Sequence, residues 1–239
     1  MEKIMYPVWK QADEGSADWR QRLLEQMSPR LLAEDVHQLR VLIVDEAVAG
    51  AAEQCIINRT PPMDGVVSMW VDSALHRAPL EHILSEYVQR FDGYLVVESE
   101  PYPLLRQERG ARYQVAEGSR TPGMCQVAML RCPPRLSYEQ WYTIWREEHG
   151  PLAYSKQAIF GYRQNTVHRA LTEDAPTLDA IVEENLVPEA IGNMQVHYAA
   201  LGDLEKYAEN QAELMESCAK FIDMDKVDCV QTSEYVMRR

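Results

Sequence analysis

Apolar residues recur along the chain with two alternating periods, and this pattern predicts the order of the secondary-structure elements. Alternation at every second residue, or a run of branched apolar residues, predicts a strand, and a spacing of three to four residues predicts a helix. In the first half of the chain the expected elements are a strand at 3–10, a helix at 16–34, strands at 37–48 and 66–72, a helix at 78–91 and a strand at 93–100. Their order is β-α-β-β-α-β.

A polar stretch with several Gly and Arg residues, 101–123, interrupts this pattern, which then repeats. The second half is expected to contain a strand at 124–132, a helix at 136–150, strands at 160–171 and 193–201, a helix at 203–222 and a strand at 227–237. Residues 173–192 are interpreted as a long polar connection. Ser137 and Gln140 have the spacing of a capping box, which would start the helix at 136–150.

The repeated order predicts an α+β fold: two ferredoxin-like β-α-β-β-α-β repeats forming a pseudo-dimeric α+β barrel. We expect an N-terminal repeat at 1–103, a connector at 104–122 and a C-terminal repeat at 123–239. A ferredoxin-like sheet carries helices on one face only, so its other face must be buried as well. The two sheets can bury these faces against each other.

Side chains of a strand alternate between its two faces, so the pattern also predicts what lines the interior. In 66–72 the apolar residues Val67, Met69 and Val71 should face the helices, while Trp70 should face the space between the sheets. In 193–201 the corresponding inward residues are Gln195 and His197. A cavity lined by aromatic residues and a few polar groups suits a small organic ligand.

Charge and cysteine usage narrow the functional classes. The formal net charge is −13, which repels phosphate backbones and anionic membranes, so nucleic-acid or membrane binding is not expected. The sequence has no apolar run long enough for a membrane span and no signal peptide, which indicates a cytoplasmic protein. Five cysteines without CxxC spacing predict reduced thiols, and no pattern calls for a metal or another cofactor.

The segment LSYEQWYTIWREEHGPLA, residues 136–153, resembles the signature of EthD-domain proteins, a helix that ends in a His-Gly-Pro-Leu corner. The segments 160–171 and 188–207 are also similar to that family, so the resemblance covers about Gly123 to Met237. The first half matches the fold pattern and lacks the motif. The resemblance implies a member of the dimeric α+β-barrel superfamily, whose proteins include isomerases, cyclases, dehydratases, decarboxylases, cofactor-free monooxygenases and heme proteins. It places any site in the C-terminal half.

Two histidines are the candidate proton-transfer groups, each with a structural alternative. His149 is expected at a helix end, where it either caps the last carbonyls or acts as a general acid or base. His197 is either a buried neutral histidine or a base near the substrate. Tyr162 and Gln164, with His168 on the same strand face, would hold an oxygen atom if that face is the interior. The remaining candidate wall residues are Trp70, Trp141, Tyr142, Trp145, Tyr154 and Gln195, although aromatic residues at helical spacing also serve as ordinary core.

These features together predict a cofactor-independent acid–base enzyme of the isomerase, cyclase, dehydratase or decarboxylase type. Its substrate would be a small, largely apolar oxygenated compound from a catabolic or polyketide-like pathway. One alternative is a non-catalytic small-molecule-binding or accessory protein, and another is a heme-dependent enzyme or a cofactor-free monooxygenase. Exposed edges or helices would also allow a homodimer.

Overall fold

A computed structural model describes residues 1–102 and 108–239 of the chain. The strands are β1 (Glu2–Trp9), β2 (Gln38–Ile43), β3 (Gly65–Val71), β4 (Arg90–Phe91), β5 (Tyr94–Tyr102), β6 (Met124–Leu130), β7 (Ile159–Ala170), β8 (Ala180–Leu186) and β9 (Asp228–Arg238). The longer helical elements are α1 (Ser16–Arg22), η1 (Leu23–Met27), α2 (Ser28–Leu32), η2 (Glu46–Gln54), α3 (Ala78–Ser85), α5 (Tyr138–Thr143), η4 (Ile144–His149), α6 (Gly150–Lys156) and α8 (Leu204–Phe221). The shorter ones are η3 (Ala74–His76), α4 (Glu108–Ala111), η5 (Pro188–Ala190) and α7 (Met194–His197).

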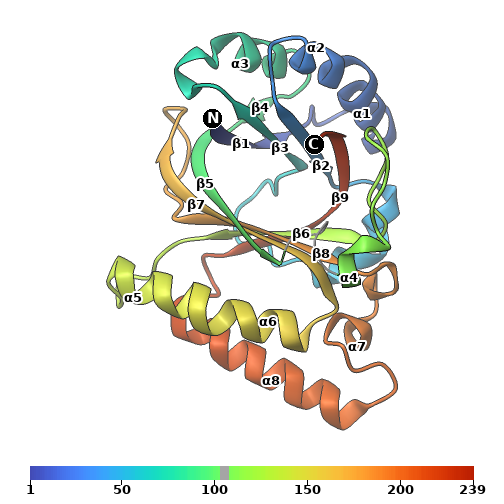
Figure 1. Cartoon of the computed structure of the whole chain (residues 1–239), viewed down its shortest axis with the longest axis vertical. Coiled ribbons are helices and arrows are strands. Elements are labelled where there is room, and N and C mark those ends of the chain that lie inside the picture. The colour runs from blue at the N-terminus through green and yellow to red at the C-terminus, as the bar shows by residue number, and fades with distance from the viewer. Residues whose placement is uncertain (103–107) are drawn as a thin grey trace.

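Eight of these strands form one closed antiparallel barrel, seen in Figure 1. They follow each other in the order β3-β2-β9-β6-β8-β7-β5-β1, and pairing of β1 with β3 closes the ring. The additional strand β4 pairs with β1. Helices α1, α2 and α3 lie on one side of the barrel, and α5, α6 and α8 lie on the opposite side (Figure 1).

The predicted fold, two ferredoxin-like repeats forming a pseudo-dimeric α+β barrel, is therefore wrong in this form. The chain makes a single closed eight-stranded barrel with one extra strand, because β2 pairs with β9 and β5 pairs with β7 across the two halves. Period and composition predict strands, but they do not show which strand edges will pair. Closure satisfies the backbone groups that two separate sheets would leave at their edges. The predicted boundary at 103/104 lies outside the described residues.

Two elements of the second half also differ from the prediction. The stretch 173–192, interpreted as a connection, contains β8, and the predicted strand at 193–201 instead contains α7. The side chain of Asn193 starts α7 by accepting a hydrogen bond from the backbone N–H of Val196 at 3.2 Å. Strand β8 is buried along its whole length although it contains Glu183, Glu184 and Asn185. These polar residues are the reason why the sequence pattern did not predict a strand there.

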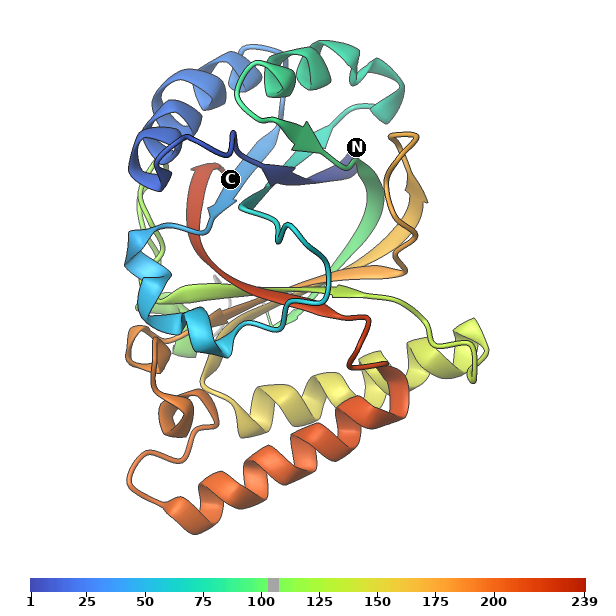
Figure 2. The same ribbon diagram turned by 180° about the vertical axis from the view of Figure 1, so that it is seen from behind.

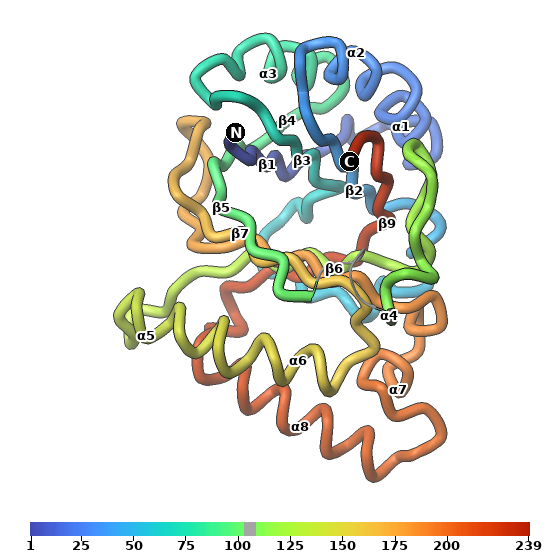
Figure 3. The backbone as a smooth tube through the Cα atoms, in the orientation of Figure 1, coloured from blue at the N-terminus to red at the C-terminus, as the bar shows by residue number. Residues whose placement is uncertain are grey.

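The predicted helix at 136–150 is present and begins with the predicted capping box of Ser137 and Gln140. It does not end at His149. The chain passes through the π-helical turn η4 and continues as α6 to Lys156, and Figure 3 shows one continuous rod. The turn is closed by a hydrogen bond from the Gly150 N–H to the Trp145 carbonyl. We attribute the continuation past Pro151 to this wider turn, because proline lacks the N–H of a regular helical hydrogen bond.

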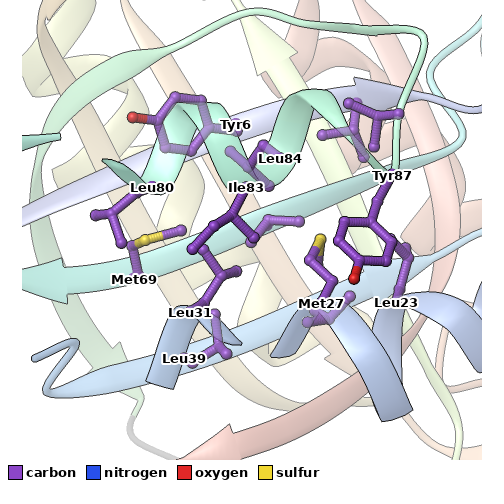
Figure 4. Close-up of a cluster of buried hydrophobic side chains, with 14 of the residues drawn as sticks. Tyr6, Leu23, Met27, Leu31, Leu39, Met69, Leu80, Ile83, Leu84 and Tyr87 are labelled. Atoms are coloured by element: carbon purple, nitrogen blue, oxygen red, sulfur yellow. The ribbon is translucent and has the colours of Figure 1, made fainter. Parts of the chain in front are cut away.

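Three apolar clusters fill the layers of the molecule. The first packs α1, η1, α2 and α3 against the barrel, and Figure 4 shows it with Leu23, Met27 and Leu31 among its members. Val67, Met69 and Val71 belong to this cluster, which confirms that they face the helices. The second lies between the barrel and the helices of the C-terminal half, and the third fills one end of the barrel interior. None of the described helices is long and apolar enough to cross a membrane.

The other end of the barrel interior holds a network of buried charges. Lys3 Nζ donates to Glu98 at 2.6 Å, to Asn165 at 2.7 Å and to Glu183 at 3.2 Å. Arg163 Nε donates to Glu183 at 3.2 Å, and its guanidinium also pairs with Glu234. The interior predicted as a ligand cavity is thus occupied at one end by packed apolar side chains and at the other by ion pairs.

Candidate functional site

A cavity of about 280 Å³ lies outside the barrel, between its wall and the helices of the C-terminal half. Strands β6, β7, β8 and β9 form its floor, η4 and α8 cover it, and η2 and α7 contribute at the rim. Figure 2 shows η2 lying beside the segment that contains α7. The Gly192 N–H donates to Gln54 Oε1 at 2.8 Å and links these two segments. The predicted location of the cavity, between two sheets, is therefore wrong.

A row of four polar side chains runs across the strands beneath the cavity, and three of them, Gln126, Glu184 and Tyr162, border it. Gln231 of β9 is paired in register with Gln126 of β6, Gln126 with Glu184 of β8, and Glu184 with Tyr162 of β7. Gln231 Nε2 donates to Gln126 Oε1 at 2.9 Å, and Gln126 Nε2 donates to Glu184 Oε2 at 2.7 Å. Side chains opposite each other on neighbouring strands lie close enough to interact, so strand register alone assembles the row.

Glu184 is the only buried carboxylate of the described chain without a Lys or Arg nitrogen within 4.0 Å. Burial disfavours its charged form and raises its pKa to about 7, against a small opposing effect of the Gln126 hydrogen bond. Its neighbour Glu183 faces the barrel interior, where Arg163 and Lys3 outweigh burial and lower its pKa. Two adjacent glutamates thus have oppositely shifted pKa values because a strand turns them to opposite faces.

Glu184 and Gln126 were not among the predicted site residues. Glu184 lies in the stretch 173–192, which the pattern indicates to be a polar connection, and Gln126 is a single polar residue within the apolar strand at 124–132. The available signal was the run AIVEENLV, where branched and apolar residues flank the acidic pair as they do in a buried strand.

Tyr162 borders the cavity next to Glu184, and its hydroxyl oxygen accepts a hydrogen bond from Gln164 Nε2 at 3.3 Å. None of the described residues accepts the hydroxyl proton in a hydrogen bond, so that proton is available for a ligand. Burial and the charge of Glu184 raise the pKa of Tyr162, so it stays protonated. The predicted pairing of Tyr162 with Gln164 is present, although both lie on the outer face of β7 rather than in the barrel interior.

His149 borders the cavity from η4. Its Nδ1 lies 3.0 Å from Ser217 Oγ of α8, and its ring packs against Phe221 at 4.7 Å between ring centroids. Burial lowers its pKa to about 4, so the imidazole is neutral near pH 7. It can form a hydrogen bond to a ligand, but it is a weak proton acceptor at that pH.

His197 also borders the cavity, from α7 rather than from a strand. Its Nε2 lies 2.8 Å from the Gln157 amide, and its Nδ1 lies 3.4 Å from Gln54 Nε2. Its carbonyl accepts from the Ala158 N–H at 2.9 Å, and burial lowers its pKa to about 4. These contacts of His197 fasten α7 to η2 and to the residues that join α6 to β7. This arrangement favours the structural alternative.

The other predicted site residues are dispersed. Trp145 borders the cavity, whereas Trp141 lies fully buried in the helical core beside it, with ring centroids 5.1 Å apart. Tyr142 accepts from Arg146 at 2.7 Å, and Tyr154 stacks on Tyr102 at 3.7 Å. The remaining three lie elsewhere: Trp70 in the barrel interior opposite Lys3, Gln195 on α7 accepting from the Gly202 N–H, and His168 exposed near the end of β7.

The walls of the cavity are aromatic and rich in sulfur. Trp145, Tyr162, Tyr198 and Phe221 contribute rings, and the sulfur-bearing residues are Cys55, Met194, Met215, Cys218, Met224 and Cys229. Burial raises the pKa of the Cys218 thiol to about 12 and that of Cys229 well above its usual value, so both are protonated and unreactive. These surfaces suit a compact apolar ligand.

The cavity does not fit a heme group. His149 has the residue type of an axial ligand, but no lining residue among those described is Lys or Arg, so nothing would pair with two propionates beside Glu184. Its volume also lies below the roughly 300–1,000 Å³ of pockets for drug-sized ligands. Within the described part of the chain, no group of three His, Cys, Asp or Glu residues is placed to hold a metal ion.

The hydrogen bond from Gln126 makes a testable contribution to this site. Replacing Gln126 with leucine removes a donor that favours the carboxylate, so the pKa of Glu184 should rise above its value of about 7. Carbon-13 NMR titration of the glutamate carboxyls would measure the shift. Gln164→Leu is the matched control, because Gln164 bonds to Tyr162 and not to Glu184. An unchanged or lower pKa in the Gln126 variant would show that this hydrogen bond does not control the carboxyl.

Comparison with known structures shows the fold. Over 100% of this chain and 94% of its own, an anthrone oxidase-like protein superposes with a TM-score of 0.58 at 7% sequence identity. A putative chlorite dismutase superposes over 99% of this chain and 95% of its own with a TM-score of 0.49 at 11% identity. No family model matches the sequence, so the EthD resemblance is not confirmed, and no curated protein is similar in sequence.

Proposed function

We propose that this protein is a small-molecule enzyme that uses acid–base chemistry in the cavity, with Glu184 accepting and returning the proton. The observation that carries this proposal is a buried carboxyl without a countercharge, facing a cavity of about 280 Å³ and with a pKa of about 7. A general base works best when its pKa lies near the working pH. This role replaces the one that the sequence suggested for His149 and His197.

Tyr162 supports a reaction in which negative charge develops on a substrate oxygen. Its hydroxyl proton is available, and it is the cross-strand neighbour of Glu184. A substrate carbonyl beside Tyr162 would receive this hydrogen bond while Glu184 removes a proton from the adjacent carbon. The developing enolate would thus be stabilised at its oxygen, as isomerisation, dehydration and decarboxylation all require.

The remaining groups of the cavity position the substrate and exclude water. Trp145 and Phe221 offer flat apolar surfaces, and His149 offers a neutral ring nitrogen. The volume of about 280 Å³ favours a compact substrate. In the N-terminal half the equivalent layer between helices and barrel is filled by Leu23, Met27 and their neighbours, which supports a single site in the C-terminal half.

Hydrogen exchange at carbon tests this proposal before the natural substrate is known. The protein would be incubated in D2O with acetophenone, 2-indanone or phenacylamine, and NMR would follow loss of the proton next to the carbonyl. The wild type should accelerate exchange of at least one compound, with a rate that rises with pH through about 7. Glu184→Gln should slow that exchange by about a hundredfold or more.

Glu53→Gln is the matched control, because Glu53 lies exposed at the rim of the same cavity. It should retain the wild-type exchange rate. Equal exchange by Glu184→Gln and the wild type would overturn the role of Glu184. Tight binding of these compounds without any exchange would instead favour a non-catalytic binding protein.

A further inference from the structure

Every buried carboxylate of the described chain except Glu184 is paired with a cationic side chain. Six carboxylates are buried in the described part of the chain, and five have a cationic partner within 4.0 Å. These pairs are Asp45 with Arg20 at 3.8 Å, Asp92 with Arg90 at 2.7 Å, Asp228 with Arg59 at 3.1 Å, Glu183 with Arg163 at 3.2 Å, and Glu234 with Arg163. Glu184 has no such partner, and it is also the one that borders the cavity.

The side chains around Glu184 supply no substitute for the missing cation. Among the described lining residues none is Lys or Arg, and burial keeps the two histidines neutral near pH 7. Gln126 donates to Oε2 of Glu184, and no described residue donates a hydrogen bond to Oε1. An ionised carboxylate in apolar surroundings is costly unless a charge or several donors compensate it. One oxygen of Glu184 therefore lacks a donor from the described protein residues, and it borders the cavity, where a ligand can provide one.

The rest of the cavity suits a positive charge better than a negative one. Aromatic faces attract cations through their ring quadrupoles, and Trp145, Tyr198 and Phe221 supply such rings here. The whole chain carries a formal charge of −13, which draws cations toward it. An anionic ligand would be repelled by the ring faces and by the negative charge of the chain.

We propose that the ligand of this cavity brings the missing countercharge: it is a small amine, bound as its ammonium ion, with a compact apolar body. The ammonium would donate to Oε1 of Glu184, and the body would lie among the rings and sulfur atoms of the walls. This inference rests on the proposed function, since it assigns a charge to the substrate of the same site. The bound cation would also keep Glu184 ionised, which is the form that a base requires.

Binding of an ammonium ion would then depend on pH through Glu184. The groups that face the cavity with it are Glu53, Cys55, His149, Tyr162, His197, Tyr198, Cys218 and Cys229. Burial lowers the pKa of both histidines to about 4 and raises the pKa of Tyr162, Tyr198, Cys218 and Cys229. Of the groups with shifted pKa values, Glu184 alone changes charge between pH 6 and pH 8. Its ionised fraction grows about tenfold across that interval, given a pKa of about 7.

Three compounds of nearly equal size test the inference: benzylamine, benzyl alcohol and benzoate. Isothermal titration calorimetry on the full chain would measure their dissociation constants at pH 6 and pH 8. At pH 8 benzylamine should bind at least tenfold more tightly than benzyl alcohol, and benzoate should bind most weakly. The affinity for benzylamine should fall about tenfold from pH 8 to pH 6, while that for benzyl alcohol should change much less.

Glu184→Gln should remove both the preference for benzylamine and its pH dependence, and Glu53→Gln should keep both. The pH series on the wild type serves as a second measurement if the Glu184 variant does not fold. The inference is overturned if benzylamine does not bind, if benzyl alcohol or benzoate binds as tightly, or if the preference survives in Glu184→Gln.

The outcomes separate this inference from the proposed function. Exchange of uncharged ketones that depends on Glu184, without a preference for amines, would overturn the ammonium ligand and keep the enzyme. A preference for amines that depends on Glu184, without exchange of any compound, would keep the ammonium ligand and overturn the enzyme.

Discussion

Replacing Arg163 with methionine should lower the free energy of unfolding by about 3–5 kcal/mol. The side chain is 1% exposed, and it neutralises Glu183 and Glu234 inside the barrel. Methionine fills similar space but leaves Glu183 with Lys3 as its remaining ion-pair partner and Glu234 with none, so that Arg40 acts on both carboxylates only from a greater distance. Removing one partner from a buried ion-pair network is costly, because the remaining charges stay buried without compensation. Urea unfolding followed by circular dichroism would measure the loss.

For a chain of this length the same change should lower the melting temperature by roughly 6–20 °C. Lys226→Ala is the control, because Lys226 pairs with Asp223 on the surface, where solvent screens the pair and it contributes little to stability. If the Arg163 variant lost no more than this control, the network would not be a main support of the barrel.

Neutralising the two adjacent glutamates of β8 should change stability in opposite directions. Glu183→Gln should destabilise the protein by about 3–5 kcal/mol, because it leaves Arg163 and Lys3 undercompensated. Glu184→Gln should stabilise it at pH 8 by roughly 3 kcal/mol, since it removes a buried charge that has no partner. The sequence change is the same, and only the face of the strand differs.

The pH dependence of the second effect follows from the pKa of Glu184. Folding raises that pKa from 4.5 to about 7, so the folded state holds the proton more tightly than the unfolded state. The stability that this group contributes is present below pH 4.5 and is lost as the pH rises through about 7. Glu184→Gln should therefore stabilise the protein at pH 8 and change its stability by about 1 kcal/mol or less at pH 5. Equal effects at both pH values, or the same sign for Glu183→Gln, would contradict these assignments.

Local features of the fold were predictable where they depend on neighbouring residues. The capping box of Ser137 and Gln140 starts α5 as expected, because both partners lie within one turn. The alternation of Val67, Met69 and Val71 correctly assigned one face of β3 to the helices. The position of α7 was not predictable in this way, because its apolar residues fit a strand as well as a short helix, and the Asn193 cap was not recognised.

Features that depend on distant parts of the chain required the structure. Closure of the barrel depends on β2 meeting β9 and on β5 meeting β7, and no periodicity shows which edges will pair. The polar row of Gln231, Gln126, Glu184 and Tyr162 likewise depends on the register of four strands. A shift of one residue in β8 would exchange the places of Glu183 and Glu184.

The sequence alone determined most of the strands and helices, the acidic charge and the face of β3 that packs against the helices, because period, propensity and composition are local properties. The tertiary structure alone decided that the strands close into one barrel and that the cavity lies outside it. It also decided which of two adjacent glutamates is ion-paired and which faces the cavity without a countercharge. The chemistry of a carboxyl group depends on its surroundings, and those surroundings come from residues far away in the sequence.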